Sequence, residues 1–447
     1  MSESLAIAAA PAAAPAALRN PYLIGGAARG ASFYGRTALI QDLLDDNPRS
    51  IWIVGNRRIG KTSLLRRLKE LGNTETRVTF YIDMQATETA NQLTQCFLDE
   101  DNTERLARLG LTAAELSDKQ PHEIMRRLDR YAAERGLNVL LLLDEAEALF
   151  TIVDSEGDQI LKNLQRVMED TSVLRVILSA TKRLLAMDSI CKSWDTTRFL
   201  DVVTPRYLGR LEQAESLALI RQSQSPMPQP VDDDVATAVL AATGGHPFLT
   251  QWLCGSRLWS DGALRRPTAE DLLPNDDINL CRMFEEDYHS LSPNEQRILR
   301  AFADVECLDE ASALALIKDC QPGQIRSLFS ALAQLCYIQR VENGYSIGNE
   351  ILRSWLKNCS VAELAPAVSD TSAMMNADEE QQAINAQLEL HAKRLRLLQA
   401  KQALQGISTP PEVAIEIEDI EKQIAGLKGR LAELRGVAYD AALAAPA

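Results

Sequence analysis

Short apolar runs alternate with amphipathic helical patterns along the first half of the chain. The helical patterns cover residues 37–46, 63–71 and 158–171, and the stretch 86–136 has room for two or three helices. Apolar runs that predict strands separate or flank them, at residues 51–54, 77–83, 139–143, 173–178 and 199–203. Strands that alternate with helices form a parallel sheet covered by helices. We therefore predict an α/β domain with a five-stranded parallel sheet.

The pattern becomes helical after Leu211. Periodic stretches at residues 212–222, 231–243 and 248–259 predict a helical subdomain. Between the last two stretches, Gly244-Gly245 ends one helix and Pro247 starts the next. Local reasoning makes His246, in the same turn, a turn or packing residue.

Three more helices are predicted at residues 293–303, 309–318 and 322–336. Two alternating runs follow them, with Asn343-Gly344 between the runs as a hairpin signature. Three helices and a hairpin are typical of a winged helix.

Two stretches near the C-terminus have heptad spacing. The first runs from Ile384 to Leu398 and the second from Val413 to Leu434. Thr409 and Glu412, in the joint between them, are spaced as a capping box. A pair this short predicts an antiparallel helical hairpin, which could be self-contained or could dock to another protein or a second copy. We favour docking or oligomerisation.

These patterns divide the chain into seven parts. We predict a disordered Ala/Pro arm (1–19), the α/β core (20–207), a helical lid (208–279), the winged helix (280–358), a linker (359–378), the helical hairpin (379–436) and a disordered tail (437–447).

Composition narrows the class of protein. The net charge of −15 disfavours a protein that coats nucleic acid or an anionic membrane. The predicted recognition helix of the winged helix carries one basic residue, Arg326, so we favour a protein-packing role there over DNA binding. Eight scattered cysteines without a Cys-x-x-Cys pair argue against zinc and fit reduced thiols. The N-terminus lacks a basic leader and the chain has no membrane-length apolar run. We expect a cytoplasmic protein.

The strand at 51–54 leads into the clearest motif of the chain. Residues Gly55, Asn56, Arg57, Arg58, Ile59, Gly60, Lys61 and Thr62 match G-x-x-x-x-G-K-T, and Ser63 continues into a helix. Backbone N–H groups of such a loop surround a phosphate, and the helix N-terminus adds partial positive charge. Lys61 would reach the β- and γ-phosphates of ATP, or the β-phosphate of ADP, and the Thr62 hydroxyl would hold Mg²⁺. A chance glycine turn would not have both the strand and the helix.

Two acids end the apolar run at 139–143. Asp144 would hold the Mg²⁺ shell, and Glu145 would polarise the attacking water. The alternative is that Asp144, Glu145 and Glu147 are only acids at the start of the next helix, where they suit its dipole. Because Asp144 and Glu145 lie downstream of a P-loop, we favour the catalytic interpretation.

Polar residues at the end of the strand at 173–178 could touch the γ-phosphate. Thr181 is the first candidate and Ser179 the second, against the alternative of strand-end capping. Tyr22 and Phe33, in the segment before the P-loop, could contact a base or simply pack that segment. Residue types alone favour packing.

The order of these motifs resembles that of STAND ATPases, the signal-transduction ATPases related to the apoptosome and plant resistance proteins. The resemblance covers about residues 20–358 and includes the archaeal-type ATPases with a Gly-Lys-Thr-Ser-Leu-Leu loop. It implies a parallel sheet of the ASCE type, similar to that of AAA ATPases. It implies an adenine and ribose site formed by Asn20, Pro21, Tyr22, Phe33, Gly35 and Arg36. It also implies that Pro247 approaches the base from the lid and that Thr181 is the sensor. The sensor position itself has no arginine, although many eukaryotic relatives carry one there. Lys182 and Arg183 follow this position instead.

The resemblance implies a slow, regulatory ATPase that converts ATP and water to ADP and phosphate. ADP would hold a closed monomer, and ATP would allow a homo-oligomer to assemble. The C-terminal hairpin resembles modules of bacterial conflict-system proteins, which implies a separate effector or sensor as partner and a role in antiviral defence. Two alternatives stay open: a DNA-loading or target-selecting ATPase that uses the winged helix, and a nearly inactive nucleotide-bound scaffold.

Overall fold

The computed structural model describes residues 20–45, 50–186, 199–225, 230–260, 262–274, 276–317 and 320–358. All of them belong to one compact unit of the chain, Met1–Asn358. The predicted arm (1–19), linker (359–378), helical hairpin (379–436) and tail (437–447) lie outside the described residues. Those four assignments stay predictions.

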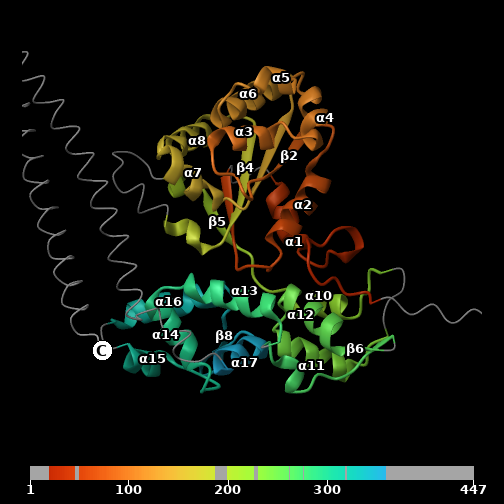
Figure 1. The fold of residues 1–447 in the computed structure, drawn as a ribbon, viewed down its shortest axis with the longest axis vertical. Helices are drawn as coiled ribbons and strands as arrows, with labels where there is room; N and C mark the ends of the chain where they lie inside the picture. Colours follow the sequence, from red (N-terminus) through yellow and green to blue (C-terminus); the bar gives the residue numbers. More distant parts are fainter. Residues whose placement is uncertain are drawn as a thin grey trace, which may run out of the picture. The chain divides into compact units, whose positions relative to one another are not determined.

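Five parallel strands form the central sheet, in the order β2-β3-β4-β1-β5. They are β1 (Ser50–Val54), β2 (Arg77–Asp83), β3 (Asn138–Asp144), β4 (Leu174–Ala180) and β5 (Thr204–Tyr207). Figure 1 shows the sheet with helices packed around it. The predicted α/β class and five-stranded parallel sheet are confirmed.

The fifth strand was predicted in the wrong place. Residues Phe199–Val202 form a 3₁₀ helix, in which Phe199 is buried, and the strand begins two residues later at Thr204. The apolar run marks a packed turn and not a strand. Pro205 is tolerated within β5 because this strand lies at the edge of the sheet and pairs only with β1.

Eight α-helices of the described residues belong to the core. Four of them connect β2 to β3, where two or three were predicted. The helices are α1 (Thr37–Leu44), α2 (Lys61–Gly72), α3 (Ala90–Phe97), α4 (Glu100–Arg108), α5 (Ala113–Leu116), α6 (Pro121–Glu134), α7 (Ala148–Glu156) and α8 (Gln159–Asp170).

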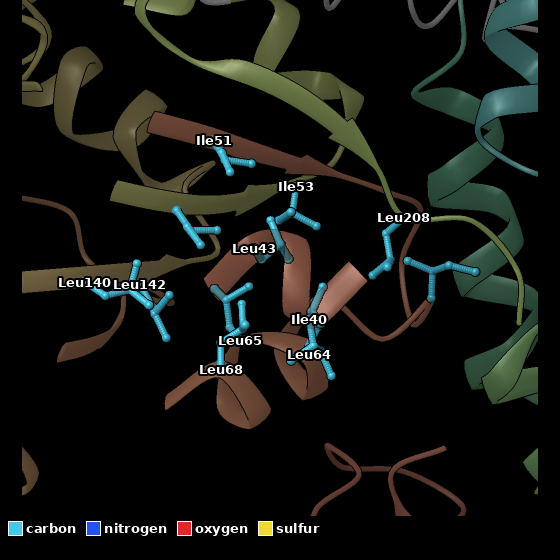
Figure 2. Close-up of a cluster of buried hydrophobic side chains, with 12 residues drawn as sticks. Ile40, Leu43, Ile51, Ile53, Leu64, Leu65, Leu68, Leu140, Leu142 and Leu208 are labelled. Carbon is cyan, nitrogen blue, oxygen red and sulfur yellow. The ribbon is translucent and has the colours of Figure 1, made fainter. Parts of the chain in front are cut away.

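One apolar cluster anchors both ends of the P-loop. Ile51 and Ile53 of β1 pack with Leu64 and Leu65 of α2, and all four side chains are at most 1% exposed (Figure 2). Full burial of an aliphatic side chain contributes about 1.5–3 kcal/mol. The strand before the loop and the helix after it are therefore fixed relative to each other.

Helices dominate the rest of the described chain. The lid region contains α10 (Gln213–Ile220), α11 (Asp233–Thr243), α12 (Pro247–Trp252), a π-helical turn (Leu253–Leu258), and the short strands β6 (Trp259–Ser260) and β7 (Ala263–Leu264). After it come α13 (Ile278–His289), α14 (Pro293–Ala301), α15 (Glu310–Leu316), α16 (Pro322–Gln334), the antiparallel pair β8 (Ile338–Val341) and β9 (Gly344–Ile347), and α17 (Glu350–Asn358). The winged-helix assignment rests on these elements and stays an interpretation. Among the described helices, none has the length and apolar character of a membrane span.

Candidate functional site

A cavity of about 740 Å³ opens beside the P-loop. This volume lies in the range of small-molecule and cofactor sites. Its wall combines residues of the P-loop, the ends of β3 and β4, the segment before α1, the lid and α13. The polar and charged members from the P-loop, α2 and the segments that follow β3 and β4 are Arg57, Arg58, Lys61, Thr62, Ser63, Arg66, Glu145, Glu147, Thr181 and Arg183.

The P-loop connects β1 to the first turn of α2. Gly60 has φ +104°, a left-handed conformation that glycine adopts without strain. The Lys61 side chain is buried, and its Nζ donates to the carbonyl oxygens of Gly55 (3.0 Å) and Asn56 (3.1 Å). These bonds hold the ammonium group across the loop, at the N-terminus of a 12-residue helix. The helix end and Lys61 together make this wall attractive to phosphate.

Predicted P-loop residues divide into two groups. Arg57, Arg58, Ile59, Gly60, Lys61, Thr62 and Ser63 line the cavity, whereas Gly55 and Asn56 do not. A Cβ on Gly55 would lie 2.8 Å from Ile59 Cγ2, so the close approach of the backbone needs glycine there. Asn56 Nδ2 donates to the carbonyl oxygen of Leu335, 2.7 Å away, after the end of α16. Asn56 is thus placed to bind the C-terminal part of the unit and not the nucleotide.

Asp144 lies at the end of β3 and is 1% exposed. The hydroxyl of Tyr81 on β2 donates to its Oδ2 at 2.8 Å, and Ser179 on β4 donates to its Oδ1. Hydroxyl donors from both neighbouring strands hold the carboxylate in one orientation, as happens for carboxylates near metal sites. The Asp144 carboxylate and the Thr62 hydroxyl are oxygen donors of the kind that Mg²⁺ binds, and Thr62 lines the cavity whereas Asp144 does not. Ser179 is fully buried against Asp144, so its predicted contact with phosphate is replaced by this bond.

Glu145 follows Asp144 and faces the cavity. Its φ of +56° is unusual for a residue with a side chain, and such strain is concentrated at functional sites. Burial raises the pKa of the Glu145 carboxyl, while the nearby Lys61 opposes the shift. A carboxylate with a raised pKa is better suited to accept a proton from water.

Glu147 is a cavity residue that the sequence analysis treated only as a helix-start acid. Its Oε1 accepts the backbone N–H of Thr181, and its Oε2 is buried without a hydrogen-bond partner among the described residues. Thr181 lines the cavity, where its Oγ1 accepts from the Arg183 N–H at 3.4 Å. Glu147 therefore positions the strand end that carries Thr181. The predicted sensor role of Thr181 stays a prediction.

Another part of the cavity wall is more apolar. Phe33 and Pro247 line it, as the resemblance implied, together with Tyr34, Leu211 and Leu219. Arg36 also lines the cavity, and its guanidinium donates to the carbonyl oxygens of Gly209 (2.5 Å) and Arg210 (3.4 Å). Gly35 lies behind this wall with φ +73°, and a Cβ there would overlap the Glu215 carboxyl at 2.3 Å.

The segment Asn20-Pro21-Tyr22 does not line the cavity. Asn20 Nδ2 donates to the Gly255 carbonyl oxygen at 2.8 Å, and the buried Tyr22 donates its hydroxyl to Ile220 O at 2.6 Å. The Tyr22 ring packs edge-on to Trp259. Asn20 and Tyr22 therefore fasten the N-terminal segment to the lid, which agrees with the packing alternative for Tyr22. A contact of Asn20, Pro21 and Tyr22 with the adenine and ribose stays a prediction.

His246 and Phe248 stand on either side of Pro247. His246 Nδ1 accepts from the Leu249 N–H at 3.4 Å and so caps α12, which agrees with a turn residue. Burial, helped by Arg36 and Arg210, lowers the pKa of His246 to about 3. Phe248 lies under the Arg58 guanidinium, 4.4 Å from ring centroid to Cζ, and joins the lid to the P-loop.

The part of the chain that contains the P-loop resembles a known family. Residues 37–187 match the AAA domain family. The chain carries a P-loop NTPase domain of the AAA type. This AAA-type domain contains the P-loop, Asp144 and Glu145, and its family binds nucleotide, typically with Mg²⁺. No curated protein matches the chain significantly.

Three of the solved structures with a similar fold come from Pyrococcus and Pyrobaculum species. A Walker-type ATPase of Pyrococcus abyssi superposes with a TM-score of 0.53 at 16% identity, over 75% of this chain and 99% of that one. A STAND protein with a tetratricopeptide repeat sensor from Pyrococcus horikoshii matches at 18% identity and TM-score 0.30, over 90% of this chain and 50% of that one. Cdc6p from Pyrobaculum aerophilum matches at 15% identity and TM-score 0.35, over 75% and 96%. The first of these comparisons supports the fold of the AAA-type domain and the elements after it.

The buried carboxyl of Asp287 on α13 should make the stability of the fold depend on pH. Burial raises the pKa of its carboxyl to about 7, although Lys61 and Arg57 oppose the shift and Glu286 adds to it. The Tyr337 hydroxyl also lies against the backbone carbonyl of Asp287. Because the folded pKa exceeds the unfolded one, this group stabilises the fold at low pH and loses that contribution as pH rises toward 7. Asp287→Asn should therefore gain stability relative to wild type, by roughly 2–3 kcal/mol, between pH 5 and pH 7.

Urea unfolding at several pH values measures this difference. The exposed Asp304, in the turn after α14, supplies the control Asp304→Asn. A stability difference between Asp287→Asn and wild type that stays constant with pH would show that Asp287 is ionised normally in the fold.

Proposed function

We propose that this chain is an ATP-hydrolysing switch of the STAND type that controls its own assembly or a separate effector. One observation carries the proposal: α13, outside the AAA-type domain, forms part of the same cavity wall as the P-loop through Asn279, Arg282, Met283 and Glu286. A nucleotide in the cavity would therefore contact both parts of the unit. A ligand can shift the balance between two arrangements only through such differential contacts.

Among the described residues, three core side chains make polar contacts with the part that follows the lid. Arg57 Nε lies 3.1 Å from Glu286 Oε2, Asn56 binds the Leu335 carbonyl, and Lys182 forms an ion pair with Glu295. Two of these contacts start in the P-loop. The third starts at the residue after Thr181, so both phosphate-facing elements of the core are tied to residues 280–358.

The Lys182–Glu295 pair is the most buried of these contacts. Glu295 is 4% exposed and also closes the capping box of α14 through Ser292. A buried carboxylate that loses its partner is strongly destabilised. We therefore propose that the Lys182–Glu295 pair either stays intact or separates completely when nucleotide exchange shifts Thr181. This all-or-none behaviour would favour two discrete states.

In the proposed reaction each core residue has one task. Lys61 and the loop N–H groups bind the β- and γ-phosphates, and Glu145 takes a proton from the attacking water. Thr62 and Asp144 would hold Mg²⁺, which would neutralise charge on the phosphates. Thr181 would sense the γ-phosphate, with its position set by Glu147. Phe33 and Pro247 would enclose the adenine.

Tyr81 gives a specific test of the proposed Mg²⁺ role of Asp144. Tyr81→Phe removes one of the two hydroxyl donors and should raise the Mg²⁺ concentration for half-maximal ATP hydrolysis by about tenfold. The measurement is a Mg²⁺ titration of phosphate release, with Tyr131→Phe on α6 as the control. An unchanged Mg²⁺ dependence in Tyr81→Phe would mean that the orientation of Asp144 does not matter for the metal.

The proposed effector step uses the C-terminal hairpin (379–436) as the contact to a separate protein, in antiviral defence. Its support is the resemblance of the motif order to STAND ATPases. DNA loading is less favoured, because Arg326 on the presumptive recognition helix α16 faces Glu310, with 3.5 Å between the charged atoms. A phosphate would have to compete with that carboxylate.

Light scattering of the full chain tests the switch. With ADP the protein should be a monomer, and with a non-hydrolysable ATP analogue a larger species should form. Lys61→Ala should stay monomeric in both. If wild-type protein binds both nucleotides and keeps one mass, the assembly part of the proposal is wrong. ATP-dependent binding to duplex DNA at moderate salt would then favour the DNA-loading alternative.

A further inference from the structure

Helix α13 presents two adjacent carboxylates to the P-loop. Glu286 Oε2 lies 3.1 Å from Arg57 Nε, and its other oxygen lies 3.6 Å from Arg282 Nε on the same helix. Asp287 Oδ1 lies 3.9 Å from the same Arg57 Nε. Both acids therefore meet the third residue of the P-loop.

These acids stand where nucleotide charge would arrive. Glu286 and Arg57 both line the cavity, and so does Lys61. The P-loop lysine is the group that reaches the β- and γ-phosphates. Asp287 is buried and does not itself line the cavity; burial raises its pKa to about 7, while Lys61 and Arg57 favour its charged form. A phosphate bound at Lys61 would thus share one cavity with the Glu286 carboxylate.

The number of phosphates decides how strong that opposition is. A triphosphate carries about one more unit of negative charge than a diphosphate, and it places this charge at the end of the chain. Like charges at several ångströms in a partly buried site repel by enough to change affinity about tenfold or more. The repulsion would act on ATP more than on ADP, because only ATP extends to the γ position.

We propose that Glu286 and Asp287 are specificity-determining residues that make the closed arrangement of α13 select a nucleoside diphosphate over a triphosphate. The inference rests on the proposed function, since it assumes that ADP and ATP occupy this cavity. It adds the chemical cause by which a third phosphate would push α13 away from the P-loop: the γ-phosphate takes over Arg57 and Lys61 and repels the two acids.

A purely structural role for the same acids predicts something different. The Arg57–Glu286 pair is about 40% exposed on both sides, and an exposed pair stabilises a fold only slightly. Its loss would then change the binding of both nucleotides equally. The ratio of the two affinities therefore separates selectivity from stability.

Calorimetric titration of the full chain with Mg²⁺ present measures that ratio. The probes are ADP and a non-hydrolysable ATP analogue, and the variants are Glu286→Gln and the double variant Glu286→Gln/Asp287→Asn. Glu285→Gln is the matched control, because Glu285 is the exposed preceding residue of α13 and does not line the cavity. Glu286 is exposed as well, so the single variant should fold even where the double one does not.

We expect wild type to prefer ADP. In the double variant the analogue should bind about tenfold more tightly while ADP affinity changes less than about threefold, with Glu286→Gln intermediate. An unchanged ratio, a parallel change for both nucleotides, or an equal effect of Glu285→Gln would overturn the inference. Failure of the switch itself has another signature. Wild-type protein would then bind ADP and the analogue, at any ratio of affinities, but its mass would be the same with both nucleotides.

Discussion

Glu145→Gln is expected to lower the rate of ATP hydrolysis by about 10²- to 10⁴-fold and to leave nucleotide affinity nearly unchanged. The glutamine keeps the size of the side chain at a strained, cavity-facing position, with φ +56°, but it cannot accept a proton from water. The loss should therefore fall on the chemical step alone. Single-turnover phosphate release, together with titration of ATP binding, measures the two quantities separately.

Two comparisons sharpen this result. Asp154→Asn, at an exposed site on α7, should hydrolyse ATP at the wild-type rate. Glu147→Gln changes the other cavity carboxylate of this strand end, which holds the Thr181 N–H. If Glu147→Gln abolishes hydrolysis and Glu145→Gln does not, the two acids have exchanged roles and our assignment of the base is wrong.

Lys61→Ala is expected to weaken binding of ATP and ADP by at least about 100-fold. Alanine removes the contact with the phosphates and also the two bonds from Nζ to the carbonyl oxygens of Gly55 and Asn56. Charge-assisted hydrogen bonds contribute about 1.5–3 kcal/mol each, so two lost phosphate contacts account for this factor. Fluorescence titration with a labelled nucleotide provides the measurement.

Lys69→Ala is the matched control for this variant. Lys69 lies two turns further along α2 and pairs with Asp101, away from the cavity. It should bind nucleotide as wild type does. Wild-type affinity in Lys61→Ala would contradict the P-loop assignment itself, whereas a loss in both variants would indicate damage to α2 and not to the phosphate site.

Local spacing made the sheet and the P-loop predictable. Gly55, Gly60 and Lys61 act through the backbone of one continuous segment, so their geometry follows from their order in the chain. Asp144 and Glu145 were predictable because they end an apolar run long enough for a buried strand. The fifth strand was misplaced because a buried aromatic, Phe199, looks the same in a packed turn as in a strand.

Contacts between distant segments were not predictable. Tyr81 reaches Asp144 only because β2 pairs with β3, a strand order that no local pattern specifies. The aromatic ring of Tyr22 suits a contact with a nucleotide base, but its hydroxyl donates to the Ile220 carbonyl oxygen in the lid. Glu286 and Asp287 look like ordinary acids of an amphipathic helix until the fold brings α13 to Arg57.

We propose that a third phosphate separates the part of the unit that contains α13–α17 from the AAA-type core. Energy transfer between a dye at Glu104 on α4 and a dye at Ser330 on α16, both exposed, tests it most directly. Dyes attached through unnatural amino acids avoid the native cysteines. We expect high transfer with ADP, lower transfer with a non-hydrolysable ATP analogue, and no change between the two nucleotides in Lys61→Ala. Equal transfer with ADP and with the analogue, in wild-type protein that binds both, would contradict it.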